Sequence, residues 1–457
     1  MRSAAPALVV LALVLAGFVA WRLVFPTPRF PEPTGPYAVG TRRFHLVDPS
    51  RPDPFVPGSA ARELMVQVWY PAAGAPDGST EPYLASSGLR DAVAGFFRLP
   101  GFLAASLQHA ATHSYPDAEP ALGRFPVLLN PTGFLGYSDS SLFWVEELAS
   151  HGYLVVGIDQ PGTAAATVFP DGRVVPAMAR EEFRRYMPLA LASEPEARPV
   201  LNGVPLPGGV IPYLAQDLSF VLGELARLDV EDPVLAGHVD LERAGSFGVS
   251  LGSYVTAEAC RRDERLKACL VADSGHTREV AGEGLRQPVM VMSRSEASFL
   301  RERERAGGWP DEEIRHTLED QEALFARSAG DAYYLEVDAM FHVNWTDAPR
   351  ALAAGAVDRA GGADRPVPRL RARERLHRRL LRQVPQGRPA DAAPGPVPRL
   401  AGVAAPLARA VTAGSPAVTG RSGGTHANST ADGRPQRPPG WATGSAVRVS
   451  HRLMSRG

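Results

Sequence analysis

The sequence predicts an α/β fold, in which helices cover both faces of a mostly parallel sheet. Unbroken apolar runs at residues 125–130 and 153–159 are typical of strands buried on both faces, and a helical pattern at residues 141–151 separates them. A serine between two glycines, in residues 248–252, fits a sharp turn from a strand into a helix. Together these observations favour parallel strands joined by crossover helices.

The remaining elements can be expected in chain order. Alternating runs at residues 43–47 and 64–70 predict a hairpin that opens the sheet. The segment between Asp159 and Gln216 is too long for a simple crossover, so it predicts a cap over the site. Further expected elements are an amphipathic helix at 216–228, a strand before and a helix after the glycine-flanked serine, and strands at 269–273, 288–292 and, last in the sheet, 333–337.

Length and composition favour one catalytic domain with appendages. The chain has 457 residues, 45% of them hydrophobic, which is enough for one large core. Two cysteines, Cys260 and Cys269, exclude a disulfide framework, and both are expected to be small buried hydrophobic side chains. A metal cluster cannot be assembled from them, and neither a metal nor an organic cofactor is expected.

Residues 1–25 are expected to be an export signal or a membrane anchor. Arg2 precedes an apolar run at residues 4–20, and Trp21 and a proline-rich stretch follow. The run is of marginal length for spanning a bilayer, and no clean small-x-small cleavage site precedes Trp21. An uncleaved anchor is favoured over a cleaved signal peptide, with the catalytic domain outside the cytoplasm in either case.

Ser250, the central residue of the glycine-flanked turn, is expected to be a nucleophile. A serine hydroxyl reacts poorly at neutral pH unless a histidine takes its proton, a carboxylate orients that histidine, and donors hold the oxyanion. The backbone amide of Leu251, directly after the serine, is expected to be one oxyanion donor. The Phe134 amide, in the loop after the strand that ends at Asn130, is expected to be the other.

His342 is the expected base, because it follows the last strand, where the α/β-hydrolase fold places its histidine. His151 and His276 are expected to be surface or supporting groups instead. Asp273, which ends the strand after the turn, is the expected acid because its strand fixes it at the active edge of the sheet. Glu296, after the next strand, is the alternative acid.

Several stretches carry a family resemblance. They are Glu-Pro-Thr-Gly-Pro-Tyr-Ala-Val-Gly-Thr at 32–41, Val-Trp-Tyr-Pro at 68–71, Ala-Ser-His-Gly-Tyr at 149–153, the serine turn, and His-Val-Asn-Trp-Thr-Asp at 342–347. Residues 33–350 thereby resemble the plasma-type platelet-activating-factor acetylhydrolases and their bacterial relatives, serine esterases with the α/β-hydrolase fold. The resemblance implies an acid at Asp273 and a short acyl ester or phospholipid as substrate. It departs at Thr132 and Val249, where the family commonly has histidine, and at Ser253, where glycine is common.

Residues 351–457 differ in composition from the rest of the chain. Their 18 Arg, 4 Asp and 1 Glu give a charge of about +13, within a chain of net charge −1, and they contain no Phe, Tyr, Ile, Lys or Cys. One expectation is a disordered basic tail. The resembled family ends instead in a helix of the type Asn-Ala-Tyr-x-x-Ala-Phe-Phe-Asp-x-Tyr-Leu. Residues 374–387, back-translated with suitable wobble bases and read one base later, give such a peptide. A second hypothesis is therefore a frameshift between about Asp347 and Asp364, after which the tail has no nucleic-acid function despite its charge.

The expected function is hydrolysis of carboxylic esters by a monomeric chain, with a small-molecule or lipid ester as its only partner besides the membrane. The resemblance extends to lipases and polyester hydrolases. A noncatalytic binding or envelope protein of the same fold is the alternative from another class, suggested by the residues at Thr132 and Val249. A dienelactone-hydrolase-like enzyme with a cysteine nucleophile is disfavoured, because neither Cys260 nor Cys269 stands in the turn.

Overall fold

The computed structural model describes residues 15–17, 19, 27–96, 100–191, 199–351 and 447–452. Most of the expected N-terminal anchor and most of the tail at residues 351–457, which is proposed to be frameshifted, lie outside these residues. Within the described parts, no helix has both the length and the apolar character needed to cross a bilayer. The membrane-spanning segment expected near the N-terminus stays a prediction, as do the domain boundaries.

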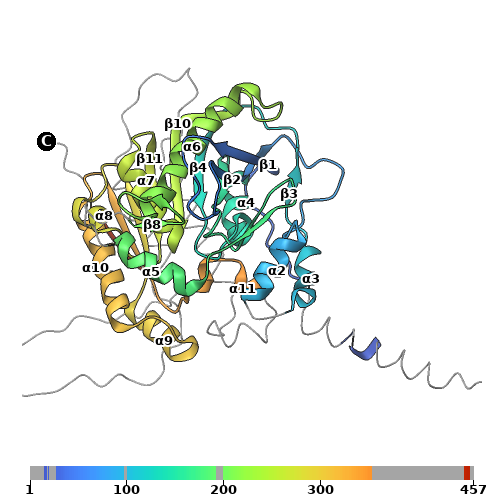
Figure 1. Ribbon diagram of the computed structural model, residues 1–457. Helices are drawn as coiled ribbons and strands as arrows, with labels where there is room; N and C mark the ends of the chain where they lie inside the picture. Colours follow the sequence, from blue (N-terminus) through green and yellow to red (C-terminus); the bar gives the residue numbers. More distant parts are fainter. Residues whose placement is uncertain are drawn as a thin grey trace, which may run out of the picture. The chain divides into compact units, whose positions relative to one another are not determined.

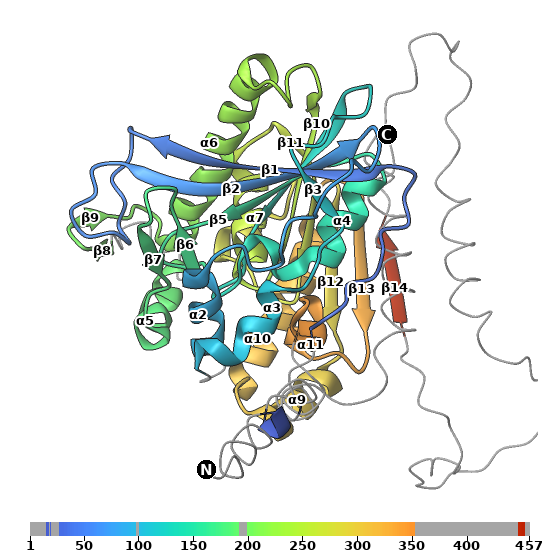
Figure 2. The ribbon, with the colours of Figure 1, turned by 90° about the vertical axis from the view of Figure 1, so that its right-hand side faces the viewer.

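A ten-stranded sheet forms the centre of the described fold (Figures 1 and 2). The six strands from β5 through β4, β10, β11 and β12 to β13 are parallel, and β2 runs antiparallel to both β1 and β5. The strands, in spatial order, are β14 (Val447–Arg452), β13 (Ala332–Val337), β12 (Val289–Arg294), β11 (Leu266–Ala272), β10 (Val239–Val249), β4 (Phe125–Pro131), β5 (Leu154–Asp159), β2 (Arg62–Ala72), β1 (Ala38–Asp48) and β3 (Ser114–Pro116). This is the α/β-hydrolase arrangement that the sequence predicts.

Helices pack on both faces of the sheet because its central strands are apolar on both sides. On one face, Val127 and Leu129 of β4 join a core with α6 (Val210–Glu231) and α7 (Leu251–Arg262). On the other face lies α4 (Leu142–Ser150), which contacts β1, β2 and β5. The other described helices are α2 (Ser87–Phe96), η1 (Gly101–Ala104), α3 (Ala105–Gln108), η2 (Ser138–Ser141), α5 (Arg180–Leu191), α8 (Arg278–Glu283), α9 (Glu296–Ala306), α10 (Asp311–Arg327), η3 (His342–Trp345) and α11 (Ala348–Ala351).

The long segment between β5 and α6 has structure of its own, as its length suggests. It contains a small hairpin of β6 (Ala166–Val168) and β7 (Val174–Pro176), then α5, then a second short hairpin of β8 (Val200–Leu201) and β9 (Val204–Pro205). Phe183 on α5 stacks on Phe134, with ring centroids 3.9 Å apart. The segment therefore contacts the loop that the sequence assigns to the oxyanion site.

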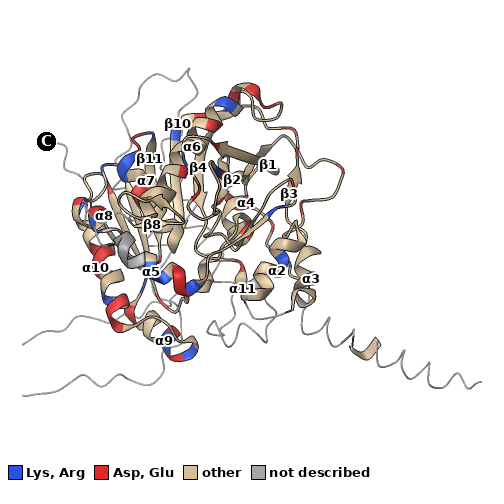
Figure 3. Cartoon of the chain, viewed as in Figure 1, with Lys and Arg blue, Asp and Glu red and all other residues tan. Residues whose placement is uncertain are grey.

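Figure 3 shows charged residues concentrated along helices such as α6, α9 and α10, while most of the sheet is formed by uncharged residues. The buried exceptions are paired. Arg62 is fully buried and contacts Asp53 and Asp217, each at 2.9 Å. These three buried charges need one another, because an unpaired buried charge would be strongly destabilising.

Two expectations are corrected. Cys260 and Cys269 are buried, as expected, but they are not separate hydrophobic side chains: they form a disulfide. Residue 260 lies near the end of α7, residue 269 lies in the adjacent strand β11, and their Cα atoms are 6.6 Å apart, a separation that a disulfide bridges readily. The strand at 333–337 is also not the last of the sheet, because β14, within the segment expected to be disordered, lies beyond it.

Candidate active site

Ser250 lies in the sharp turn that the glycine pattern predicts. Strand β10 ends at Val249, α7 begins at Leu251, and Ser250 between them has φ 59° and ψ −127°, a backbone conformation that L-residues rarely adopt. The flanking glycines are required by close packing. A Cβ at Gly248 would lie 2.2 Å from the Gly252 carbonyl oxygen, and a Cβ at Gly252 would lie 2.2 Å from that of Pro131. The strained serine is therefore held by packing on both sides.

Asp273 stands beside Ser250 because their strands are adjacent and in register. Val249 pairs with Ala272, so Ser250 and Asp273 are the next residues at the carboxyl ends of β10 and β11. The Ser250 amide donates to the Ala272 carbonyl at 3.0 Å, and the Asp273 amide donates to the Met292 carbonyl at 2.9 Å. Asp273 also has a positive φ, 54°. Both residues thus follow the last ladder positions of their strands.

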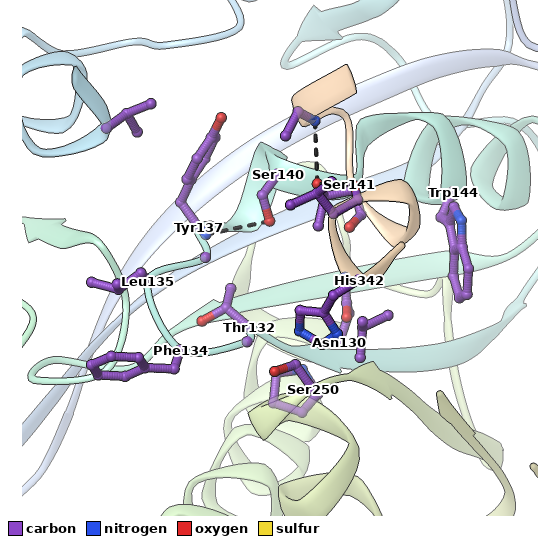
Figure 4. Close-up of a pocket in the computed structure, with 18 of the residues that line it drawn as sticks. Asn130, Thr132, Phe134, Leu135, Tyr137, Ser140, Ser141, Trp144, Ser250 and His342 are labelled. Carbon is purple, nitrogen blue, oxygen red and sulfur yellow. Dashed lines mark hydrogen bonds between the residues drawn. The ribbon is translucent and has the colours of Figure 1, made fainter. Parts of the chain in front are cut away.

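His342 reaches Asp273 from the loop after β13. It begins η3, and its Nδ1 lies 2.8 Å from Oδ2 of Asp273, whose side chain is fully buried. Since Nδ1 makes this contact, Nε2 is the ring nitrogen left to interact with a nucleophile. Ser250 and His342 line the same pocket, and Figure 4 shows the serine side chain next to the imidazole ring. The structure thus brings the three expected residues together.

The alternative acid, Glu296, does not join this group. It is the first residue of α9 and its side chain is exposed. The residue that reaches Asp273 from this part of the chain is Arg294, the last of β12, whose Nε donates to Oδ1 of Asp273 at 2.7 Å. Burial by itself would raise the pKa of Asp273, but the Arg294 charge and the His342 contact outweigh burial and hold this pKa below its ordinary value. Asp273 is therefore ionised at neutral pH.

Arg294 is the residue near the site that sequence reasoning missed. Its side chain is fully buried, and its guanidinium also pairs with Glu302 of α9. The available signal was an arginine at the end of an apolar strand, where a buried charge needs a partner. That signal does not name the partner, because Asp273 lies 21 residues earlier in the chain.

The loop after β4 packs closely against the turn that carries Ser250. A Cβ at Gly133 would lie 3.3 Å from the Val249 carbonyl oxygen and 3.5 Å from the Ser250 Cβ. The loop is fixed by the Leu135 amide, which donates to the Thr163 carbonyl at 2.8 Å. Phe134 lies between Gly133 and Leu135 and lines the pocket with Ser250 (Figure 4). Leu251, directly after the nucleophile, is the first residue of α7, where backbone amides have no partner within the helix. The loop of Phe134 and the first turn of α7 thus both adjoin Ser250, and the role of the two amides stays a prediction.

The pocket is a cavity of about 160 Å³ with a mainly apolar lining. Trp144 of α4 and Phe247 of β10 stack in its wall with ring centroids 5.7 Å apart. Residues from α2, α3 and the His342 loop complete it, and its apolar side chains include Val93, Leu107, Trp144, Phe247, Val249 and Val343. It can therefore enclose an apolar group beside the serine.

His151 and His276 do not line the pocket that holds Ser250. His151 Nε2 lies 3.0 Å from Glu147 of the same helix. His276 is fully buried, and burial lowers its pKa to about 3, so it is neutral. Among the described residues, no group of His, Cys, Asp and Glu could hold a metal ion.

Comparisons with known proteins give one informative result. No model of a known protein family matches the chain, and no curated protein sequence matches it either. Among solved structures, a ferulic acid esterase from Streptomyces cinnamoneus is similar, with a TM-score of 0.59 and 26% sequence identity over 81% of this chain and 97% of the esterase. The chain thus has the α/β-hydrolase fold, and its likeness to an esterase supports carboxylic ester hydrolysis as its general class of reaction.

Proposed function

We propose that this chain is a serine hydrolase that cleaves carboxylic esters through an acyl-enzyme, with Ser250 as nucleophile, His342 as base and Asp273 as the orienting acid. One observation carries the proposal: His342 contacts the buried Asp273 carboxylate at 2.8 Å from the same pocket that holds Ser250. The strained backbone of Ser250 supports it, because such strain concentrates at functional positions.

The proposed reaction has two halves. His342 takes the Ser250 proton while the serine oxygen bonds to the ester carbonyl carbon, and the protonated imidazole then gives that proton to the departing alcohol as its C–O bond breaks. Water enters, loses a proton to His342, and its oxygen bonds to the acyl carbon. The Ser250 oxygen leaves with the proton from His342. Asp273 keeps the imidazole oriented and stabilises its charged form.

The negative oxygen formed in each half is proposed to bind the amides of Phe134 and Leu251. Backbone donors are fixed by the fold, so they need little reorganisation during the reaction, and removing one such donor typically slows catalysis about 10²–10³-fold. Thr132 and Val249, where the resembled family has histidine, leave these backbone groups unchanged. Their effect is expected on rate and substrate choice.

A short acyl group is the proposed substrate feature, in a small-molecule ester or a phospholipid as in the platelet-activating-factor acetylhydrolases. The cavity of about 160 Å³ is close in size to engineered cavities of about 150 Å³ that bind benzene, which supports a short chain or a single ring. The aromatic pair Trp144 and Phe247 in its wall makes an aromatic acyl group the second candidate. Long-chain lipase or polyester substrates fit this size less well.

An extracytoplasmic location is also proposed. The Cys260–Cys269 disulfide supports it, because disulfides persist in oxidising compartments and are rare in the cytosol. The apolar run at residues 4–20 supports it as well. The chain is further proposed to act as a monomer without nucleic-acid partners.

The decisive experiment is hydrolysis of p-nitrophenyl esters from acetate to palmitate, with a feruloyl ester beside them. The wild-type chain, Ser250→Ala and the matched control Ser253→Ala, a buried serine three residues along, are compared. Short-chain activity that only Ser250→Ala loses supports the proposal. A folded wild type that neither turns over any ester nor reacts with a fluorophosphonate would leave the noncatalytic binding protein as the better reading.

A further inference from the structure

Arg294 contacts Asp273 directly and is connected to the backbone of His342 through Glu302. Its Nε donates to Oδ1 of Asp273 at 2.7 Å, while the other carboxylate oxygen contacts the imidazole at 2.8 Å. The carboxylate is therefore held on both oxygens, and its orientation is fixed by the arginine as well as by the histidine.

Arg294 is also connected to the backbone of the loop that carries His342. Arg294 Nη1 pairs with Oε2 of Glu302, and that oxygen accepts a hydrogen bond from the His342 amide at 3.1 Å. Nη1 also donates to the Met340 carbonyl at 3.4 Å, two residues before the histidine. The loop that carries the imidazole is therefore attached to the same guanidinium that holds the acid.

Aromatic rings enclose this guanidinium. Its carbon lies 3.9 Å from the centroid of Phe299 and 5.0 Å from that of Trp309. Trp309 in turn meets the His342 ring edge-on, with centroids 5.4 Å apart. Water is thus largely excluded around the Arg294 charge, and charges act more strongly on one another in such surroundings.

We propose that Arg294 is a positioning residue that sets both the orientation of His342 and the pH range in which its imidazole serves as a base. This inference rests on the proposed function. The physical reason is that the arginine charge offsets part of the Asp273 charge. A lone carboxylate would stabilise imidazolium more strongly, so the histidine would stay protonated, and inactive as a base, to higher pH.

Other charged groups around His342 must be accounted for. Glu302 faces its amide from α9, and Glu313 approaches from α10; burial raises the pKa of Glu313, while Arg184 of α5 and His342 oppose that increase. These groups are unchanged in single variants of Arg294. Both variants lose the guanidinium fork, so the comparison of Arg294→Met with Arg294→Lys, rather than with the wild type, reports on the charge at position 294.

The test compares Arg294→Lys, which keeps the charge, with Arg294→Met, which removes it. The acidic limb of the kcat/KM profile is expected to move up by about one pH unit in Arg294→Met and to stay near its wild-type position in Arg294→Lys. Both variants are expected to lose at least about tenfold in kcat, since lysine lacks the guanidinium fork. If Arg294→Met folds poorly, the double variant Arg294→Met/Glu302→Leu takes its place, because it also removes the Glu302 carboxylate that the single variant leaves unpaired.

An independent readout separates this proposal from the proposed function. The imidazole of His342 is titrated by NMR in the wild type and in Arg294→Met, whether or not either hydrolyses esters. A titration midpoint that rises in the variant supports the inference, even if the wild type has no esterase activity. An unchanged midpoint in a variant whose circular dichroism matches the wild type overturns it.

Discussion

The carboxylate of Asp347 accepts a hydrogen bond from the backbone amide of Leu142, the first residue of α4. The Asp347 amide in turn donates to the Ser140 carbonyl at 2.8 Å. One residue thus ties the loop that carries His342 to the segment that follows the oxyanion loop. Because Asp347 is fully buried, water cannot readily replace these contacts.

Replacing Asp347 by alanine is therefore expected to loosen the site. Loss of a buried hydrogen bond to a charged group should lower the free energy of unfolding by about 2 kcal/mol, and kcat/KM should fall about tenfold or more as His342 shifts. Asp347→Asn keeps an acceptor and should lose less of both. Chemical denaturation and ester kinetics check this, and an alanine variant with wild-type kinetics would show that the contact is not needed.

The Cys260–Cys269 disulfide is expected to stabilise the fold. Cys260 and Cys269 are nine residues apart, so the chain-entropy estimate for closing this loop is about 2.5 kcal/mol. Cys260→Ala/Cys269→Ala should lower the free energy of unfolding by up to this amount, and dithiothreitol should destabilise the wild type but not the double variant. Thiol titration of the denatured, unreduced wild type should find no free thiols; two thiols would contradict the bridge.

Asp139 should make stability depend on pH. Burial raises its pKa to about 7, although Arg43, 3.2 Å away, opposes the shift. The native state then binds more protons than the unfolded state between about pH 4 and 7, so wild-type stability falls as the pH rises through this window. Asp139→Asn lacks this titrating carboxyl group. The free energy of unfolding of the variant minus that of the wild type should therefore rise between about pH 4 and 7, by up to about 4 kcal/mol. Chemical denaturation at pH 4, 5.5, 7 and 8.5 measures this difference, and Glu264→Gln, at an exposed position, is the control. A difference that does not change with pH would refute the raised pKa of Asp139.

Phe183 should support the oxyanion loop from the insertion. Its ring stacks on Phe134, and such aromatic pairs contribute about 1 kcal/mol beyond burial. Phe183→Ala is expected to reduce kcat several-fold with a smaller effect on global stability, because Phe183 is only partly buried at the edge of the core. Arg185→Ala, an exposed change on the same helix, is the matched control. Equal kinetics in the two variants would mean that the stack does not position Phe134.

The sequence predicted the parts of the fold that depend on local pattern. The apolar runs that became β4 and β5 are unmistakable because both faces of these strands are buried, and the glycines around Ser250 mark a turn that other residues could not make. The relation between Ser250 and Asp273 also followed, since adjacent parallel strands end at one edge of the sheet.

The features that were missed depend on contacts between distant or differently oriented elements. Pattern alone does not show that residue 260 near the end of a helix faces residue 269 on the next strand, so the disulfide was misread. The role of Arg294 was not recognised, because its partners, Asp273 after β11 and Glu302 of α9, are distant in the sequence. Strand β14 lies in a segment whose composition predicts disorder, and composition does not reveal pairing with an existing sheet edge.

The left-handed backbone at Ser250 and Asp273 has a consequence for how this chain can evolve. Each such residue stores about 1–3 kcal/mol of strain, which a glycine would relieve. At position 250 that exchange would remove the nucleophile but leave no buried charge unpaired. At position 273 a glycine would leave the buried Arg294 charge without its partner. A lineage that no longer needed the reaction would therefore gain stability by losing its serine, while the acid, no longer of use, would persist as a structural residue.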